Sequence, residues 1–408
     1  MQRRKALAVA ASEGRGATDG MTARSSIVIA RRATRRLHPW VFSNEVREAP
    51  PGLDSGAVVG VVERDRFVGS AIYSPHSLIR ARLFSSDDRE LDADLFTRRL
   101  ADAAENRARW LPAEQDYRLV HGESDGLPGL TIDRYGRHFA LQAYAAGMDK
   151  RQGLVVEALR NLFDVQAIWA KNDFALRELE GLPRIERLLW GSPSDVLIAE
   201  NGVRFEVDVA SGQKTGFYFD QRLNRARIRL LSDGKSVLDL FCYNGGFAVN
   251  AAVGGAKHVL AVDSSRPACA LAEKNAALNR VGDRVEILCG DAFDVLRELN
   301  SRDKRFDLIV IDPPPFARSQ RDKPRALRAY RDLNLQAMRL LTPGGMLLSC
   351  TCSQHVSWTD LASVLTQAAQ ASGREFRIVE RTGQGPDHPV LLHMPESEYL
   401  RSCLIQLT

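Results

Sequence analysis

Carboxylates stand in or directly after successive apolar runs of the chain, and this regular spacing could hold a ligand. The first run, 237–241, contains Asp239 and leads into a turn with Gly245 and Gly246. A small-residue helical pattern follows, so the segment predicts the strand, glycine turn and helix that begin a nucleotide-binding α/β unit. The next run ends in Asp263, at the place where such units hold ribose hydroxyls.

A third carboxylate and the composition of the turn narrow the class of ligand. Asp291 ends the third run, where it could meet the amino group of an adenine. The turn lacks the spacing G-x-G-x-x-G, so a dinucleotide pyrophosphate fits poorly and an adenosine without phosphates, S-adenosylmethionine, fits better. Any one acid could instead cap a helix, above all Asp291. The expected cofactor-binding residues are Gln221, Asp239, Tyr243, Asn244, Gly245, Asp263, Ser264, Asp291, Ala292 and Asp312.

A proline-rich motif, Asp312-Pro-Pro-Pro-Phe316, ends the fourth strand of the same pattern. Proline lacks an N–H group and fixes φ, so this loop is rigid and makes few hydrogen bonds within the sheet. A flat aromatic base could stack on Phe316 and donate an amino hydrogen to the carboxylate of Asp312. The motif is typical of base methylation, and the alternative is a stiff surface turn.

Two cysteines, Cys350 and Cys352, lie at the end of the fifth strand. Carbon 5 of a pyrimidine is too weak a nucleophile to take a methyl group from a sulfonium unaided, whereas thiolate attack on carbon 6 activates it. Cys352 is the better candidate nucleophile because it lies closer to the loop, and either cysteine could instead pack in the core. The six cysteines show no C-x-x-C pair and the histidines form no cluster, so we expect free thiols and no metal site.

One sheet is needed to bring these residues together, and the pattern from residue 234 onward predicts it. Strands are expected at 236–241, 258–262, 285–289, 306–311, 345–350, 376–381 and 400–407, with helices near 247–253, 266–279, 292–299, 327–341 and 359–372. This alternation is typical of a doubly wound α/β sheet, which binds ligands at the carboxyl ends of its strands. The last strand follows a loop without a crossover helix, so we expect it to be antiparallel.

The first half of this 408-residue chain predicts two further domains. Strands at 26–30, 57–63, 67–73 and 78–84 indicate a β-rich module. A helix is expected over 92–109. A further helix over 151–162, with strands at 131–135, 138–144 and 167–171, indicates a strand-rich middle domain. We expect a disordered extension at 1–25 and domains at 26–105, 106–210 and 211–408. The segment 214–222 could cover the adenosyl site or serve only as a linker.

Basic charge gathers at the N-terminus of the chain. Residues 1–40 carry nine Lys and Arg against two acids, a balance of +7, whereas the whole chain carries +5. Such a patch suggests contact with a polyanion, and we expect Arg35 and Arg36 to bind the substrate; the alternative is a solvated tail. No apolar run approaches the roughly 18 residues of a membrane span, and we see no export signal, so we expect a cytoplasmic protein without a membrane partner. The oligomeric state is left open, a homodimer included.

Taken together, these segments resemble the bacterial large-subunit rRNA cytosine-5 methyltransferases that use S-adenosylmethionine. The resemblance runs from about residue 26 to the end of the chain. The motifs that carry it are Leu37-His-Pro-Trp-Val-Phe-Ser43, Tyr73-Ser-Pro-His-Ser-Leu-Ile-Arg80, Glu123-Ser-Asp-Gly-Leu-Pro-Gly129, Lys214-Thr-Gly216, Asp220-Gln-Arg222, Asp239-Leu-Phe-Cys-Tyr-Asn-Gly-Gly-Phe247, Asp312-Pro-Pro-Pro-Phe316, Thr351-Cys-Ser353 and Asp387-His-Pro389.

The resemblance implies an N-terminal PUA domain that binds RNA, a central α+β domain and a C-terminal Rossmann-like domain that methylates carbon 5 of a cytidine in 23S rRNA. It assigns the nucleophile to Cys352 and implies a covalent bond between Cys352 and carbon 6, with Asp312 stabilising the base edge. Pro315 stands where the family often has Lys. The alternatives are a guanosine amino-nitrogen RNA methyltransferase that needs no nucleophile, and a non-catalytic RNA-binding assembly factor.

Overall fold

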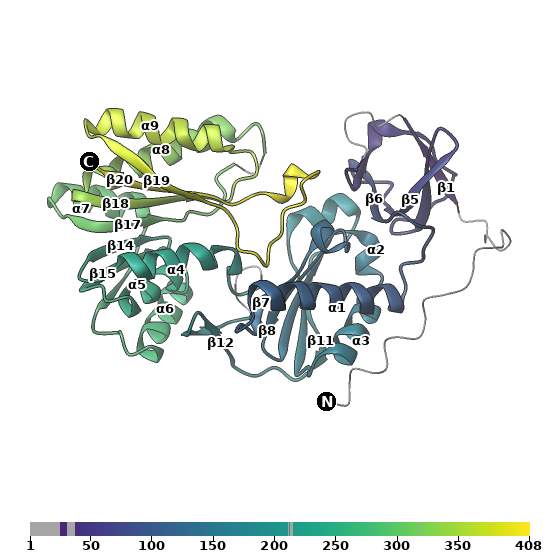
Figure 1. Ribbon diagram of the computed structural model, residues 1–408, viewed down its shortest axis with the longest axis horizontal. Helices are drawn as coiled ribbons and strands as arrows, with labels where there is room; N and C mark the ends of the chain where they lie inside the picture. Colours follow the sequence, from purple (N-terminus) through teal and green to yellow (C-terminus); the bar gives the residue numbers. More distant parts are fainter. Residues whose placement is uncertain (1–24, 31–36, 211, 213–214, 318) are drawn as a thin grey trace.

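The structure is a computed structural model that describes residues 25–30, 37–210, 212, 215–317 and 319–408. This part of the chain holds sheets of six, five and seven strands and a separate two-stranded hairpin. Figure 1 shows the seven-stranded sheet in one lobe and the other two sheets in two smaller lobes beside it. The predicted disordered extension lies outside the described residues, apart from Ser25.

The N-terminal lobe is an almost wholly antiparallel six-stranded sheet. Its elements are β1 (Ser26–Ile29), β2 (Trp40–Phe42), the 3-10 turn η1 (Ser43–Glu45), β3 (Val46–Glu48), β4 (Val58–Glu63), β5 (Arg66–Tyr73) and β6 (Ile79–Ser85). The strand order is β2-β6-β5-β4-β1-β3, and only β1 and β4 run parallel. Ile27, Val41 and Val59 belong to a small apolar core of its own.

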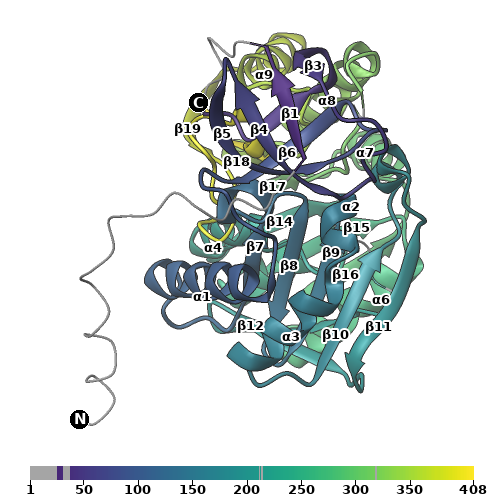
Figure 2. The same cartoon turned by 90° about the vertical axis from the view of Figure 1, so that its right-hand side faces the viewer.

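The central lobe combines a five-stranded sheet with helices. Its elements are α1 (Ala93–Trp110), β7 (Asp116–His121), η2 (Gly122–Asp125), β8 (Leu130–Tyr135), β9 (His138–Ala143), α2 (Ala146–Asp149), α3 (Gln152–Leu162), β10 (Ala167–Asn172), η3 (Ala175–Glu180) and β11 (Ile185–Gly191). The strand order is β11-β10-β9-β8-β7. Phe96 and Leu100 of α1 and Leu159 of α3 pack on one side of this sheet, together with Ile132 and Leu141. Figure 2 shows the two helices lying against these strands.

The C-terminal lobe is a seven-stranded doubly wound sheet preceded by a hairpin and a helix. Its elements are β12 (Val196–Glu200), β13 (Val203–Val207), η4 (Phe219–Gln221), α4 (Arg222–Leu231), β14 (Ser236–Leu240), α5 (Gly246–Val253), β15 (His258–Asp263), α6 (Arg266–Leu278), β16 (Val285–Cys289), α7 (Ala292–Ser301), β17 (Phe306–Ile311), α8 (Lys323–Arg339), β18 (Leu341–Thr351), α9 (Trp358–Ser372), β19 (Phe376–Thr382), η5 (Pro395–Ser397) and β20 (Arg401–Leu407). The strand order is β16-β15-β14-β17-β18-β20-β19.

Both faces of this sheet are covered by helices, because apolar residues alternate toward two cores. Val237 of β14 lies in the core with α4, α5 and α6, whereas Leu238 lies in the core with α7, α8 and α9. Figure 1 shows these two sets of helices on opposite sides of the strands. β20 is antiparallel to both of its neighbours, and the other pairs are parallel, so the predicted fold and its antiparallel last strand are confirmed.

Several elements were not predicted from the sequence. β2 and β3 have three residues each, too short to show an alternating pattern. The hairpin β12–β13 packs into the C-terminal lobe, since Ile198 and Phe205 share a core with Val237. β18 begins four residues before the predicted strand, and α8 begins four residues before the predicted helix. Among the described residues, no helix is both long enough and apolar enough to cross a membrane.

Candidate active site

The residues predicted to bind ligand gather at one edge of the seven-stranded sheet. Asp239 is near the end of β14 and Asp263 ends β15, while Asp312 follows β17 and Cys352 follows β18. The C-terminus marks one end of the lobe, and β20 runs antiparallel to β18, so the carboxyl ends of the parallel strands face the other two lobes (Figure 1). This is the edge at which open α/β sheets bind ligands.

The loop after β14 is held in an unusual backbone conformation. Phe241, Tyr243 and Gly245 have φ values of 66°, 49° and 81°, in the left-handed region that non-glycine residues rarely adopt. A Cβ atom at Gly245 would also lie 3.1 Å from Cβ of Ala272 on α6. The backbone therefore turns sharply over the sheet edge, and only glycine fits its last left-handed position without strain.

Carboxylate oxygens hold this loop in place. Oδ2 of Asp263 accepts a hydrogen bond of 2.9 Å from the amide of Tyr243, and Oδ1 accepts one of 2.8 Å from the amide of Ser265. Oδ2 of Asp239 accepts from the amide of Ala248 at 2.9 Å. These contacts fix the strand ends relative to one another and leave further lone pairs of Asp263 directed at the edge where ribose hydroxyls are expected.

Two buried polar atoms beside this loop make no hydrogen bond with any described residue, Oδ1 of Asp239 and Nδ2 of Asn244. Burial, and after it the charges of Asp312 and Asp263, raise the pKa of Asp239 well above its usual value. A buried donor and a buried acceptor without partners cost free energy unless a ligand satisfies them. The sharp turn and these two atoms therefore fit a polar, adenosine-type ligand such as S-adenosylmethionine.

Asp291 has the role that the sequence left as an alternative, since it is the N-cap of α7. Its Oδ1 accepts hydrogen bonds from the amides of Phe293 and Asp294, at 2.9 and 3.2 Å. An N-cap carboxylate keeps a second oxygen, so capping does not prevent a contact with an adenine. The neighbouring Ala292 is buried, and the carbonyl of Ser264 lies 3.8 Å from Sγ of Cys289.

Gln221 lies behind the site rather than in the loop after β14. Its Oε1 accepts a hydrogen bond of 2.5 Å from Nδ2 of Asn224, whose amide also reaches Oγ of Ser402 at 2.9 Å. Gln221 is buried, and its side chain contacts that of Cys350. A direct contact of Gln221 with the cofactor therefore stays a prediction. In the structure its side chain contacts Cys350 near the end of β18.

The two motifs that carry the base chemistry meet in space. Sγ of Cys352 lies 3.8 Å from the carbonyl oxygen of Pro313, the residue directly after Asp312. Cys352 is half-buried, so its thiol can be reached at the strand ends. The thiol of Cys352 thus lies beside the loop that carries Asp312, at the ends of neighbouring parallel strands, where the two side chains could attack a planar base and hold its polar edge.

Cys350 has a different environment from Cys352. It is fully buried, and burial followed by the charge of Asp312 raises the pKa of its thiol well above the usual value. A thiol that stays protonated is a poor nucleophile. Of the two cysteines, only Cys352 combines access with proximity to the proline loop.

Phe316 sits in a cluster of aromatic rings at the end of the proline loop. Its ring centroid lies 4.9 Å from that of Tyr330, 6.3 Å from that of Phe293 and 6.5 Å from that of Phe241. Such edge and tilted contacts keep a ring in one orientation. Phe316 is half-buried, so part of its surface is available for stacking a base.

Four residues near the thiol were not among the predicted site residues: Tyr218, Asp220, Tyr330 and Tyr399. Burial raises the pKa of Tyr218 above its usual value, and the charges of Tyr243, Asp220, Cys352 and Asp312 raise it further. Burial also raises the pKa of Tyr330 to about 12, with a contribution from Cys352. A single sequence gave no signal for Tyr330 or Tyr399. For Asp220 the signal in the sequence is the motif Asp220-Gln-Arg222, one of those that carry the family resemblance.

The loop that leads to β20 ties the site to the central lobe. Asp387 accepts a hydrogen bond of 3.0 Å at Oδ2 from the amide of Arg118, and its carbonyl accepts one of 2.9 Å from Nη2 of Arg107. Oδ1 of Asp387 lies 3.0 Å from Nδ1 of His388, whose ring centroid is 5.1 Å from that of His121. The loop that carries Asp387 and His388 is thus anchored on a second lobe by buried polar contacts.

Some predicted substrate residues cannot be placed. Arg35 and Arg36 lie outside the described residues, as does Lys214 of the segment 214–222 that could cover the adenosyl site. Within the described ranges, no group of three or more His, Cys, Asp and Glu side chains could hold a metal ion.

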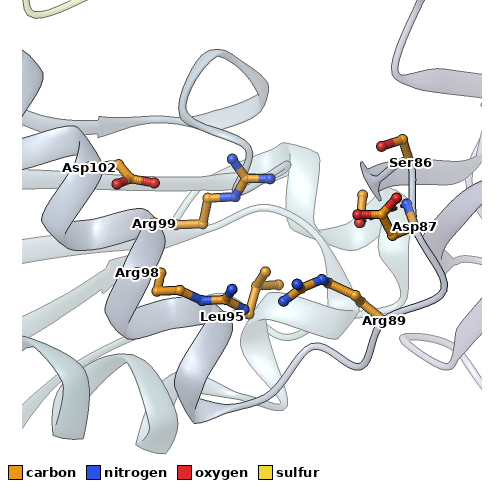
Figure 3. Close-up of a pocket in the computed structure, with 8 residues that line it drawn as sticks. Ser86, Asp87, Arg89, Leu95, Arg98, Arg99 and Asp102 are labelled. Atoms are coloured by element: carbon orange, nitrogen blue, oxygen red, sulfur yellow. Dashed lines mark hydrogen bonds between the residues drawn. The ribbon is translucent and has the colours of Figure 1, made fainter. Parts of the chain in front are cut away.

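A hollow of about 250 Å³ lies apart from the strand ends, between the segment after β6 and the start of α1. Arg89, Arg98 and Arg99 extend toward its open space (Figure 3), while Asp87 and Asp102 also line it. Arg98 forms an ion pair of 3.0 Å with Asp94. Arg99 makes no hydrogen bond or ion pair with any residue that the structure describes. One guanidinium is therefore available to an anion from solution.

Comparisons with known protein families agree with this geometry. The family described as S-adenosylmethionine-dependent methyltransferase matches residues 185–395, and the PUA-like domain matches residues 29–86. The first match begins at β11 and includes the hairpin, the glycine turn, the proline loop and both cysteines.

Curated relatives cover almost the whole chain. A protein of Pseudoalteromonas translucida named ribosomal RNA large subunit methyltransferase I is 39% identical over 384 residues, 92% of this chain and 97% of the relative. The protein of the same name from Klebsiella pneumoniae is 40% identical over 375 residues, 90% of this chain and 93% of the relative.

Solved structures show the same fold. A crystal structure of a methyltransferase complexed with SAH has a TM-score of 0.81 and 23% identity, and it covers 93% of this chain and 99% of that chain. An S-adenosylmethionine-dependent methyltransferase from Streptococcus mutans has a TM-score of 0.80 at 23% identity, with the same coverage.

Proposed function

Because the chain belongs to the S-adenosylmethionine-dependent methyltransferases, in the family of the ribosomal RNA large subunit methyltransferases I, we propose that it methylates carbon 5 of a cytidine in 23S rRNA. The expected methyltransferase fold, its S-adenosylmethionine cofactor and the N-terminal PUA-like domain are confirmed by the family matches. The observation that carries the choice of carbon 5 is the thiol of Cys352 beside the proline loop.

The thiol decides between classes of methylation. An amino nitrogen has a lone pair and can take a methyl group without covalent help, whereas carbon 5 of a cytosine needs a nucleophile at carbon 6. Cys352 is accessible and lies next to the Asp312 loop, while Cys350 is fully buried. The position of an accessible thiol at this strand end therefore supports carbon-5 chemistry over nitrogen methylation.

Different residues of this chain would bind the cofactor and attack the base. Asp239, Asn244 and Asp263, with the turn at Gly245, would hold S-adenosylmethionine. When bound, this cofactor supplies an electrophilic methyl group on a sulfonium. Sγ of Cys352 attacks carbon 6 of the cytosine, which makes carbon 5 nucleophilic.

Two further residues would hold the cytosine itself. The carboxylate of Asp312 accepts a hydrogen bond from the amino edge of the base, and Phe316 stacks on its ring. The target nucleotide has to leave its stack to reach them, as enzymes that modify bases require.

The RNA would be held by surfaces away from the strand ends. PUA-like domains are small β modules, and this one lies on the side of the C-terminal lobe toward which the carboxyl ends of its parallel strands point (Figure 1). The hollow at Arg89, Arg98 and Arg99 lies where this module joins the central lobe, and Arg99 can contact a phosphate. Since Asp87 and Asp102 line the same hollow, we expect its contribution to affinity to be small.

Trapping with a mechanism-based substrate tests the proposal. Fluorine at carbon 5 cannot leave as a proton does, so 23S rRNA made with 5-fluorocytidine should form a denaturant-resistant complex with the wild-type protein in the presence of S-adenosylmethionine. Cys352→Ser should form none, whereas Cys350→Ser should still form it. A complex that persists in Cys352→Ser, or none in the wild type, would contradict carbon-5 chemistry through Cys352.

The modified nucleotide can be identified independently. Mass spectrometry of 23S rRNA nucleosides from a strain that lacks the gene should show the loss of one 5-methylcytidine. Loss of a methylated guanosine instead would favour the amino-nitrogen alternative, and full activity of Cys352→Ala would agree with that outcome.

A further inference from the structure

A carboxylate and a tyrosine form a buried pair beside the thiol, and the proposed function gives them no role. The hydroxyl of Tyr399 donates a hydrogen bond of 2.6 Å to Oδ2 of Asp220. Asp220 is 8% exposed, and its other oxygen, Oδ1, is buried without a hydrogen-bond partner among the described residues. A buried acceptor without a partner is costly, which points to a ligand or reacting group that meets it.

The pairing of β18 with β20 brings Tyr399 and Cys352 to the same end of the sheet. Thr351 of β18 pairs with Arg401 of β20 in an antiparallel ladder. This is the last pair of the ladder, so Cys352, the residue after Thr351, and Tyr399, two residues before Arg401, leave the two strands at the same end of the sheet. The electrostatic influence of Cys352 on the tyrosine agrees with this position, since burial first and Cys352 among the smaller causes raise the pKa of Tyr399.

Two contacts fix the position of Asp220, one made by its own carbonyl group and one made by the next residue. Its carbonyl accepts a hydrogen bond of 3.0 Å from the amide of Gly385, in the loop that leads to β20. The next residue, Gln221, contacts the side chain of Cys350, two residues before the thiol. Asp220 and Asp312 therefore lie on different elements, one in η4 and the other directly after β17.

Carbon-5 methylation requires a second proton-accepting group. After methyl transfer, carbon 5 carries both the methyl group and its original proton, and carbon 6 is bonded to Sγ of Cys352. A base must take the proton; the electron pair of that C–H bond then forms the double bond between carbons 5 and 6, and the carbon–sulfur bond breaks to release the thiolate. Asp312 is already assigned to the amino edge of the cytosine.

We propose that Asp220 is the base that accepts the carbon-5 proton, and that Tyr399 is a positioning residue that holds its carboxylate; this inference rests on the proposed function. The proton ends on Oδ1 of Asp220, the oxygen without a partner. Tyr399 cannot be the base itself, because its raised pKa keeps it a neutral donor. The other nearby groups are engaged: the hydroxyl of Tyr330 bonds to Thr351 at 2.8 Å, and His388 faces Asp387.

The experiment separates methyl transfer from proton removal. Four proteins are compared: the wild type, Asp220→Asn, Tyr399→Phe and the surface control Asp283→Asn. Each is mixed with S-adenosylmethionine and with 23S rRNA that comes from a strain lacking the gene and carries tritium at carbon 5 of its cytidines. Three quantities are followed: methyl groups incorporated, tritium released, and protein–RNA complex that resists denaturant.

For Asp220→Asn we expect about one methyl group per enzyme, a stable complex with ordinary cytidine, and tritium release slowed at least about 100-fold, the range for losing a general base. The double variant Asp220→Asn with Cys352→Ala should form no complex. Tyr399→Phe should slow tritium release about tenfold, and Asp283→Asn should match the wild type.

Two results would overturn the inference. One is tritium release by Asp220→Asn at the wild-type rate; the other is loss of methyl transfer with no complex in a variant that still binds S-adenosylmethionine by calorimetry. If Asp220→Asn does not fold, Asp220→Glu keeps the carboxylate and should retain part of the release rate. A wild type that releases no tritium would instead refute the proposed function.

Discussion

The cofactor half of the site and the base half are built by different means. The cofactor half, defined by Asp239, the loop 241–245 and Asp263, consists of backbone turns fixed by carboxylates within one continuous α/β unit. The base half, defined by Asp220, Asp312, Cys352 and Tyr399, consists of side chains from four separate elements. The first is local in sequence, and the second exists only when the whole lobe and its neighbour are folded.

This difference predicts that the two halves can be lost independently. Cys352→Ala removes the nucleophile and should reduce kcat by at least about 10⁴-fold. Calorimetry should show an unchanged affinity for S-adenosylmethionine, because no cofactor contact is altered. A variant that loses cofactor binding as well would show that the halves are one unit.

A charge at the lobe junction should affect stability rather than chemistry. Oδ2 of Asp116 accepts a hydrogen bond of 2.9 Å from the amide of Ala199, and burial raises the pKa of Asp116 from 3.8 to about 6. Between these two pH values the folded state keeps a proton that the unfolded chain has released, so the free energy of unfolding falls as pH rises.

Asp116→Asn removes this titration and keeps an acceptor for Ala199. The wild type loses about 3 kcal/mol of unfolding free energy through this group as the pH is raised from about 3.5 to 7, and the variant does not. The free energy of unfolding of the variant minus that of the wild type should therefore rise by about 3 kcal/mol over this range. Urea unfolding at several pH values measures the difference. A constant difference across that range would mean that Asp116 does not titrate as the burial implies.

Loss of a carboxylate in the cofactor half should weaken cofactor binding. Asp263→Ala removes two hydrogen bonds to backbone amides, at Tyr243 and Ser265, that shape the loop. Charged hydrogen bonds contribute about 1.5–3 kcal/mol each, so the Kd for S-adenosylmethionine should rise about 10–100-fold. The exposed Asp283→Ala is the control and should bind normally; equal affinity of both variants would contradict the ribose assignment.

The glycine turn offers a smaller test of the backbone half. Gly245→Ala places a Cβ at φ 81° and 3.1 Å from Cβ of Ala272, which should cost about 1–2 kcal/mol of unfolding free energy and weaken cofactor binding. Gly153→Ala on α3 has open space around its Cβ and should be neutral or stabilising. If both substitutions had the same effect, the turn would not be strained.

The smallest effect is expected outside both halves. Arg99→Ala should raise the Kd for 23S rRNA about two- to fivefold and lower the salt dependence of binding by about one charge, because it removes one phosphate contact. Affinity for S-adenosylmethionine should not change. Filter binding at several salt concentrations measures this, with Arg302→Ala, on the exposed end of α7, as a matched arginine control.

The strand, turn and helix that form the cofactor half can be predicted from the sequence for a physical reason. Strands buried on both faces give continuous apolar runs, and a turn that needs a left-handed residue selects glycine. β14 and its loop can therefore be recognised from the local sequence pattern. The same holds for the ends of β15 and β17, where Asp263 and Asp312 follow apolar runs. The meeting of Cys352 with the proline loop follows from neighbouring parallel strands.

Other elements have a weaker signal in the sequence. The buried face of α4 is made of Arg222, Asn224, Arg225 and Ile228, so an apolar helical pattern is absent. Arg225 forms a two-pronged pair with Glu200 at 2.6 Å, and such charges are buried only because they are paired. The hairpin turn at Asn201 and Gly202, both with positive φ, does have a recognisable sequence signal, the Asn-Gly pair.

Asp220 and Tyr399 could not be predicted from spacing, because their contact joins segments 179 residues apart along the chain. Nothing local in either segment specifies the other. Only the closure of β20 against β18 brings them together, and a single sequence does not record which side chains meet in that way.

The anchoring of Asp387 on the central lobe has a consequence for control of the enzyme. Since Arg107 and Arg118 hold the loop that leads to Tyr399, a small rotation between the lobes would withdraw that loop while the glycine turn stays intact. Such an enzyme would remain loaded with methyl donor yet idle. Binding at the lobe junction could therefore reduce turnover without competition with either substrate.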